Sequence, residues 1–166
     1  MLETYSPKAV EQRCASITTP LQCCFSGEKN LLTLTRDFGQ KKVEALVKVY
    51  LLEMNELLNL RNPLNEACID RIASMVVKDY RNLNFADIRN LLDNGARGRY
   101  SRDGEVLMIN YSIVMGWFER YSAKRCDDIE DYNLNVHEQR KREWMNLPRS
   151  NENIPIKEWL RRGRQS

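Results

Sequence analysis

The chain of 166 residues carries 26 basic and 23 acidic side chains, so its formal net charge of +3 is too small to demand a nucleic-acid partner. Hydrophobic residues make up 42% of the chain and charged residues 30%, which is typical of a globular protein with one sizeable core. No apolar run approaches the ~20 residues that a membrane-spanning helix needs, so we expect no membrane partner.

The first 27 residues have a mixed pattern. Ser6 and Pro7 predict a short helix, with serine as its N-cap and proline at its first position. The segment TTPLQCCFSGE then interrupts it. We therefore expect residues 1–27 to be a partly ordered segment ahead of a helical domain at 28–146.

The cysteines indicate a reducing compartment. There are five, an odd number, and no basic start with a following apolar stretch marks a secretory signal. We expect free thiols and a cytoplasmic protein. Cys23 and Cys24 are adjacent, and no pair of cysteines has metal-ligand spacing, so neither a metal nor another cofactor is expected.

Residues 40–60, QKKVEALVKVYLLEMNELLNL, carry the clearest structural pattern of the chain. Apolar residues recur there with the 3.6-residue period of a helix that is buried on one face. That face comprises Val43, Leu46, Val47, Tyr50, Leu51, Met54, Leu57 and Leu58.

Three further helices follow. Asn62 and Pro63 predict the start of a helix whose buried stripe includes Ile69, Ile72 and Val76. Asn84 predicts the cap of the next helix, in which Asp87 favours the positive end and Phe85, Ile88, Leu91 and Leu92 face inward. Gly95 is expected to end it in the left-handed conformation. A last helix carries Ile113, Trp117 and Tyr121 at intervals of four and continues to about Asn146.

The fold class predicted from these patterns is all-α, a helical bundle of about five to six helices. Asp103–Gly104 is a dipeptide typical of hairpin turns, so one short β-hairpin at residues 99–109 is compatible with the sequence. Residues 147–166 are expected to form a basic C-terminal tail.

Catalytic motifs are absent from the sequence. His137 is the only histidine and lies in a polar segment, and there is no phosphate loop, dinucleotide fingerprint or nucleophile elbow. We therefore expect no enzyme, no catalytic residue and no small-molecule substrate.

The segment GARGRYSRDG, residues 95–104, admits two interpretations. Arg97, Arg99 and Arg102 with Tyr100 between them suit phosphate contacts and base stacking. Alternatively the glycines shape a connector and the arginines are solvated or pair with nearby carboxylates. The preceding helix is a poor reader of the major groove, because Asp87 and Asp93 would repel phosphate.

The C-terminal tail is the second candidate for phosphate contacts. Residues 139–166 hold eight basic side chains against three acidic ones. The candidates there are Arg161, Arg162 and Arg164, although such tails are also often only solvated.

Aromatic residues give a third candidate site. Trp117 and Phe118 are adjacent, hence about 100° apart on a helix, so both are buried only if the helix is covered broadly. Core packing is the first interpretation of Trp117, Phe118 and Tyr121. The second is a partner-binding face.

The order of features between residues 31 and 125 resembles a helical family without an established activity that is common in Bacteroidetes, their phages and their conjugative elements. The shared features are an initial LT segment, a long helix that ends in a leucine-asparagine turn, and a helix that ends in an aromatic residue. They continue with the segment Leu83–Ile88, the basic loop Gly95–Gly104, and a helix with Trp117, Tyr121 and Arg125. Many such relatives look similar to replication accessory proteins, which bind a helicase or single-stranded DNA.

The resemblance and the loop chemistry together predict a non-enzymatic, nucleic-acid-associated accessory protein of a mobile element or phage, acting in DNA replication. Its partners would be DNA, through phosphate contacts, or a replication protein. The alternative is a protein-interaction adaptor or regulator that docks through the Trp117/Phe118 face.

Overall fold

The computed structural model describes residues 1–59, 62–100 and 109–146. Within these ranges the chain forms eight helices and no strand, which confirms the all-α fold class. The number exceeds the expected five to six because the N-terminal segment contributes three short helices. The hairpin considered at residues 99–109 falls mainly on 101–108, which lie outside the described ranges. Within those ranges an isolated antiparallel bridge joins Asn30 and Asn84.

The chain divides into two compact units, Met1–Glu130 and Asp131–Ser166. The first unit holds α1 to α7 and the first part of α8, the long helix Tyr111–Asn146. In the second unit, residues 131–146 continue α8, and all of them are exposed except the half-buried Val136.

The N-terminal segment belongs to the core of the first unit. It forms α1 (Leu2–Tyr5), α2 (Pro7–Arg13) and α3 (Pro20–Cys24), and Ser6 caps α2 as predicted by accepting from the Ala9 amide. Val10, Cys14 and Cys23 are buried with the other core residues. Helices of four to seven residues are too short to show a hydrophobic period, which is why the sequence set this segment apart.

Helices α4 (Leu31–Phe38) and α5 (Gln40–Leu58) meet at Gly39, whose φ of 86° suits glycine. The predicted apolar face of α5 is buried from Val43 to Met54. The prediction was wrong for Leu57, which is 71% exposed, because the last turn of α5 runs past the core before Asn59 ends it in the left-handed conformation.

Helix α6 (Glu66–Asp79) starts three residues later than predicted, with Asn65 rather than Asn62 as its N-cap. Two hydrogen bonds explain the shift. The Asn55 side chain accepts from the Leu64 amide and donates to the Leu64 carbonyl, each at 3.0 Å, and so ties the chain before α6 to α5. The buried stripe of Ile69, Ile72 and Val76 is as expected.

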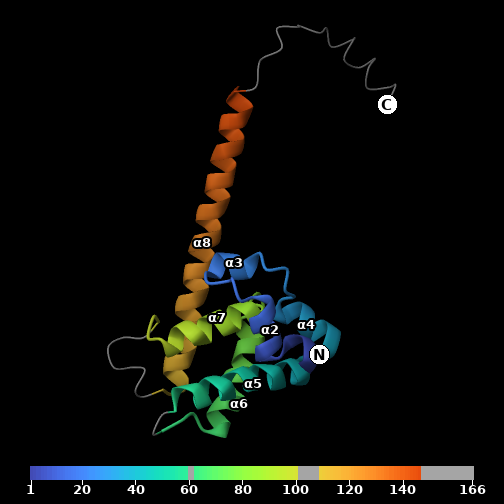
Figure 1. The fold of residues 1–166 in the computed structure, drawn as a ribbon, viewed down its shortest axis with the longest axis vertical. Helices are drawn as coiled ribbons and strands as arrows, with labels where there is room; N and C mark the ends of the chain where they lie inside the picture. Colours follow the sequence, from blue (N-terminus) through green and yellow to red (C-terminus); the bar gives the residue numbers. More distant parts are fainter. Residues whose placement is uncertain (60–61, 101–108, 147–166) are drawn as a thin grey trace. The chain divides into compact units, whose positions relative to one another are not determined.

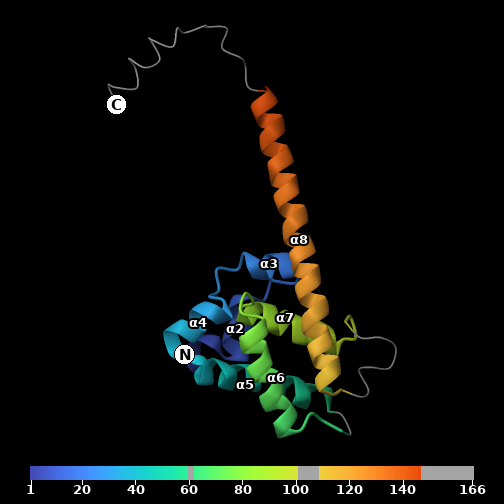
Figure 2. The same ribbon diagram turned by 180° about the vertical axis from the view of Figure 1, so that it is seen from behind.

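Helix α7 (Phe85–Ala96) packs against α2, α3 and α5, and the first turns of α8 lie beside it (Figures 1 and 2). Trp117, Phe118 and Tyr121 of α8 are fully buried. Phe118 meets Tyr80 of the α6 end at 5.3 Å between ring centroids. The suggestion that these three aromatics form a partner-binding face is therefore wrong, because neighbouring helices cover α8 broadly enough to bury adjacent positions.

Close approach of α7 and α8 depends on Gly95. A Cβ atom at this position would lie 2.7 Å from Cδ2 of Trp117 and closer still to Cε3. Gly95 therefore lies inside α7 to admit the indole ring, and the prediction that it ends the helix was wrong.

A buried polar cluster joins the start of α7 to α8. The Asp87 carboxylate accepts from the Tyr121 hydroxyl at 2.8 Å, from Nε of Arg125 at 3.1 Å and from the Asn84 amide at 3.0 Å. Asn84 in turn accepts from the Asp87 amide, which completes a capping box, and its Nδ2 donates to the Cys23 carbonyl of α3.

Electrostatics in this cluster are balanced. Burial raises the pKa of the Asp87 carboxyl, whereas the guanidinium of Arg125 and the donors Asn84 and Tyr121 oppose that rise. Asp87 is fully buried and Arg125 is 7% exposed, so each charge depends on the other for its solvation.

We expect Arg125→Met to lower the free energy of unfolding by ~3–5 kcal/mol, because it leaves the Asp87 charge buried without its cation. Asp87→Asn combined with Arg125→Met should cost less than the sum of the two single changes. Chemical denaturation of the four proteins measures this coupling. Lys124→Met, one residue away in an exposed pair with Asp128, is the control and should cost at most ~1 kcal/mol. Equal losses for Arg125→Met and Lys124→Met would contradict the structural role of the buried pair.

We expect Gly95→Ala to destabilise the protein by ~1–3 kcal/mol through overpacking against Trp117, although alanine is the better helix former. Gly116→Ala in α8 is the matched control, since its Cβ would meet mainly the end of the flexible Arg120 side chain. Thermal unfolding of both variants provides the measurement. A Gly95→Ala protein as stable as the Gly116→Ala protein would show that α7 and α8 can separate at no cost.

Candidate functional site

The outward face of α7 carries two rows of polar side chains. Arg89, Asp93 and Arg97 follow one another at intervals of four residues, and Asn90 and Asn94 form the neighbouring row. Residues at this spacing are adjacent on a helix surface. The opposite face of α7 is buried in the core, and so is Asn94, which is 7% exposed. The other residues of these rows are the part of the helix that a ligand can reach.

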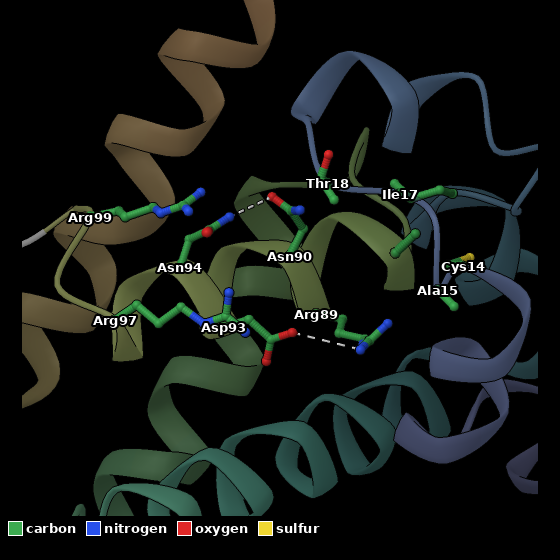
Figure 3. A pocket seen from close by; sticks show the side chains of 11 residues that line it. Cys14, Ala15, Ile17, Thr18, Arg89, Asn90, Asp93, Asn94, Arg97 and Arg99 are labelled. Carbon is green, nitrogen blue, oxygen red and sulfur yellow. Dashed lines mark hydrogen bonds and ion pairs between the residues drawn. The ribbon is translucent and has the colours of Figure 1, made fainter.

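A pocket of about 190 Å³ lies between this face and the connection from α2 to α3 (Figure 3). Asp93 lies between Arg97 and Arg89 along one side, with Arg99, Asn94 and Asn90 along the other. The pocket brings three arginines together with one carboxylate. Its lining residues are Cys14, Ala15, Ile17, Thr18, Ala86, Arg89, Asn90, Asp93, Asn94, Arg97 and Arg99.

The end of α7 determines where Arg99 lies. Gly98 has a φ of 80°, its amide donates to the Gly95 carbonyl at 2.9 Å, and the Arg99 amide donates to the Asn94 carbonyl at 2.9 Å. These two bonds define a Schellman cap, in which a left-handed glycine reverses the chain. The reversal carries Arg99 back over the last turn of α7, where it lines the same pocket as Arg97.

The three arginines differ in how they are engaged. Arg89 is paired, with its NH2 atom 3.1 Å from Glu11 Oε1 and its Nε atom 3.7 Å from Asp93 Oδ2. Arg97 and Arg99 are exposed, and their guanidinium groups make no ion pair or hydrogen bond with any side chain in the described ranges. Within the described ranges, an anion at Arg97 and Arg99 would therefore displace no carboxylate from either guanidinium.

Asp93 limits the positive character of the pocket. Burial raises the pKa of its carboxyl, and the guanidinium groups of Arg89 and Arg97 oppose the rise. In its ionised form the carboxylate offsets one of the three arginines, so its protonation would increase the attraction of the pocket for anions.

The sequence analysis placed Arg97, Arg99, Tyr100 and Arg102 at one nucleic-acid site. The structure brings Arg97 and Arg99 together, whereas Arg102 lies outside the described residues, as do Arg161, Arg162 and Arg164. Tyr100 is half-buried, with its ring edge-on to Tyr121 at 6.0 Å between centroids. Its ring thus contributes to packing, and stacking on a base would require it to leave Tyr121.

Arg89, Asn90 and Asn94, which line the pocket together, were not predicted from the sequence. Their spacing along α7 was visible, but the presence of Asp87 and Asp93 argued against phosphate binding by this helix. Asp87 is in fact fully buried and paired, so only Asp93 opposes an anion at the surface. Thr18 lines the pocket because the α2–α3 connection folds over α7, and no local sequence pattern predicts that contact.

Other kinds of site find no candidate in the described ranges. No group of three or more His, Cys, Asp or Glu side chains is placed to hold a metal ion there. None of the helices described combines the length and apolar character needed to cross a membrane. All five cysteines, each within these ranges, are free thiols.

Comparison of the chain with family models, with curated proteins and with solved structures gives no match.

We expect Asp93→Asn to strengthen sulfate binding in the pocket by ~1 kcal/mol, the interaction of two charges ~4 Å apart in water. In the unmodified protein, sulfate affinity should rise as the pH falls and Asp93 is protonated. Because the pKa of Asp93 is raised, this rise should begin at a higher pH than an ordinary aspartate would give. NMR titration of the arginine Nε–H signals at several pH values measures both effects. Asp93→Asn should flatten the pH profile, and an unchanged profile in that variant would contradict the role of this carboxyl.

Proposed function

We propose that the protein is a non-enzymatic accessory protein that binds nucleic acid through its backbone phosphates, in the pocket on α7. One observation carries the proposal. The exposed guanidinium groups of Arg97 and Arg99, which no described carboxylate pairs with, converge on a concavity that also holds Arg89, Asn90 and Asn94.

The chemistry of the lining suits a phosphodiester. Guanidinium groups donate paired hydrogen bonds to phosphate oxygens, and amide and hydroxyl side chains such as Asn90 and Thr18 add neutral donors. The carboxyl end of α7 contributes about half a negative charge, which the guanidinium groups outweigh. Phosphate is thus the anion class that this donor set recognises best.

The same geometry favours contacts to the backbone over reading of bases. The side chains that reach solvent line a hollow rather than a convex helix surface that could enter a major groove. Asn94 donates to Asn90 at 2.9 Å, so these two amides are partly engaged with each other. We therefore expect binding with little sequence preference.

The biological setting is proposed from the resemblance of residues 31–125 to the proteins of phages and conjugative elements. It suggests a role in the replication of a mobile element, with DNA or a replication protein as the partner. The adaptor alternative required Trp117 and Phe118 at the surface, and their complete burial removes that version of it.

We expect the Arg97→Ala/Arg99→Ala double variant to bind single-stranded DNA more weakly and to reduce the slope of log affinity against log salt by about 1.4 units. Each phosphate contact with a single strand contributes ~0.7 to that slope through counterion release. Fluorescence anisotropy with a labelled oligothymidylate at several salt concentrations measures the slope.

Arg36→Ala/Arg81→Ala is the matched control, because it removes the same charge from two exposed positions outside the pocket. That variant should keep the slope of the unmodified protein. A wild-type protein that binds no DNA at low salt, or equal losses in both double variants, would refute phosphate binding by the pocket.

A further inference from the structure

A second hollow region lies on the first unit, along the flank of α5 that faces the start of α2. It consists of two adjoining hollows of about 280 and 320 Å³, which share Pro7 and Glu53 among their lining residues. We call it the α2–α5 groove. Its lining includes Pro7, Val49, Leu52, Glu53, Met54 and Leu57.

Large apolar side chains stand at the surface of this groove. Val49, Leu52 and Leu57 are 37%, 48% and 71% exposed. All three belong to α5: Val49 and Leu52 lie beside the stripe that the helix buries in the core, and Leu57 continues that stripe beyond the end of the core. Single exposed apolar residues are common, whereas three within nine residues that line two adjoining hollows are typical of a binding surface.

Glu53 lies in the middle of the groove and makes no ion pair or hydrogen bond with another side chain in the described ranges. Partial burial, Glu11 and Asp93 raise the pKa of its carboxyl, with Arg89 and Lys8 opposing. The two neighbouring carboxylates make the field at this position favourable to an added cation. Glu56 at the edge of the groove adds a further negative charge.

We propose that the α2–α5 groove docks an amphipathic helix of a partner protein, with apolar residues at positions i and i+7 and a lysine or arginine at i+4. The cation would meet Glu53, and the apolar residues would lie on Val49 and Leu57. This surface is additional to the proposed nucleic-acid pocket.

The dimensions of the groove fit such a ligand. The nine residues from Val49 to Leu57 extend about 12 Å along α5, and positions i and i+7 of a partner helix lie about 10.5 Å apart. Helices that dock in grooves present anchors at this spacing. The charged side chains that line the groove are the carboxylates of Glu11, Glu53, Glu56 and Asp93 and the cations of Lys8, Arg89 and Arg97, of which Arg89 is paired with Glu11. The excess of one carboxylate favours a cation over a phosphate here.

The test uses two synthetic helical peptides rich in alanine and glutamine, with leucine at positions 4 and 11. The first has lysine at position 8 and the second has glutamate there. We expect the unmodified protein to bind the lysine peptide at least tenfold more tightly than the glutamate peptide, as measured by fluorescence anisotropy. Glu53→Lys should reverse this preference, and Leu57→Asp should weaken the lysine peptide at least tenfold.

Leu32→Asp is the matched control, since Leu32 of α4 is 54% exposed and lies outside the groove lining. It should leave peptide binding unchanged. Circular dichroism and thermal unfolding serve as folding controls for the variants at Leu57 and Glu53, neither of which lines the nucleic-acid pocket.

Three outcomes would overturn the proposal. They are binding of neither peptide, equal loss in Leu32→Asp and Leu57→Asp, or failure of Glu53→Lys to change the preference. Self-association of the protein that Leu57→Asp abolishes, without peptide binding, would instead identify a second copy of the chain as the occupant. None of these outcomes depends on whether the α7 pocket binds DNA.

Discussion

The buried carboxylate of Asp87 is the interaction on which the arrangement of the first unit depends. It receives hydrogen bonds from the backbone of Asn84 and from Tyr121 and Arg125 of α8, and Asn84 also bonds to the end of α3. One end of α7 is thus held to two other helices. Gly95 holds the opposite end by admitting the Trp117 ring. With both ends fixed, the polar rows of α7 can only face outward.

A buried ion pair adds little net stability, because both groups lose their hydration when the protein folds. Its main effect is to select one packing arrangement of α7 against the neighbouring helices. A helix that carried only Phe85, Ile88, Leu91 and Leu92 could rotate or shift by a turn and still bury an apolar face. Asp87 can meet Arg125 and Tyr121 in one register alone. That register determines which residues of α7 reach the pocket, so fold specificity and the candidate site depend on the same contact.

The sequence predicted those features that rest on local periodicity or on local capping, such as the buried face of α5 from Val43 to Met54 and the Ser6 and Asn84 caps. It failed where tertiary contacts decide. Asn62 and Asn65 are equally good caps, and the bonds between Asn55 and Leu64 select the second. Gly95 looked like a helix end because the Trp117 ring above it is invisible in sequence. Arg97 and Arg99 could be proposed from composition, but their convergence with Arg89 required the Gly98 cap and the burial of Asp87.

The row formed by Arg89, Asp93 and Arg97 lines both the pocket on α7 and the α2–α5 groove. These side chains cannot bind ligands in both hollows at the same time. A guanidinium that turns toward a phosphate in the pocket moves away from the carboxylates of the α2–α5 groove. Ligands at the two places would therefore influence each other's affinity. Thermodynamic linkage requires this influence to be reciprocal. The factor by which one ligand changes the affinity for the second equals the factor by which the second changes the affinity for the first. A shared helix row is enough for this coupling, without any change of fold.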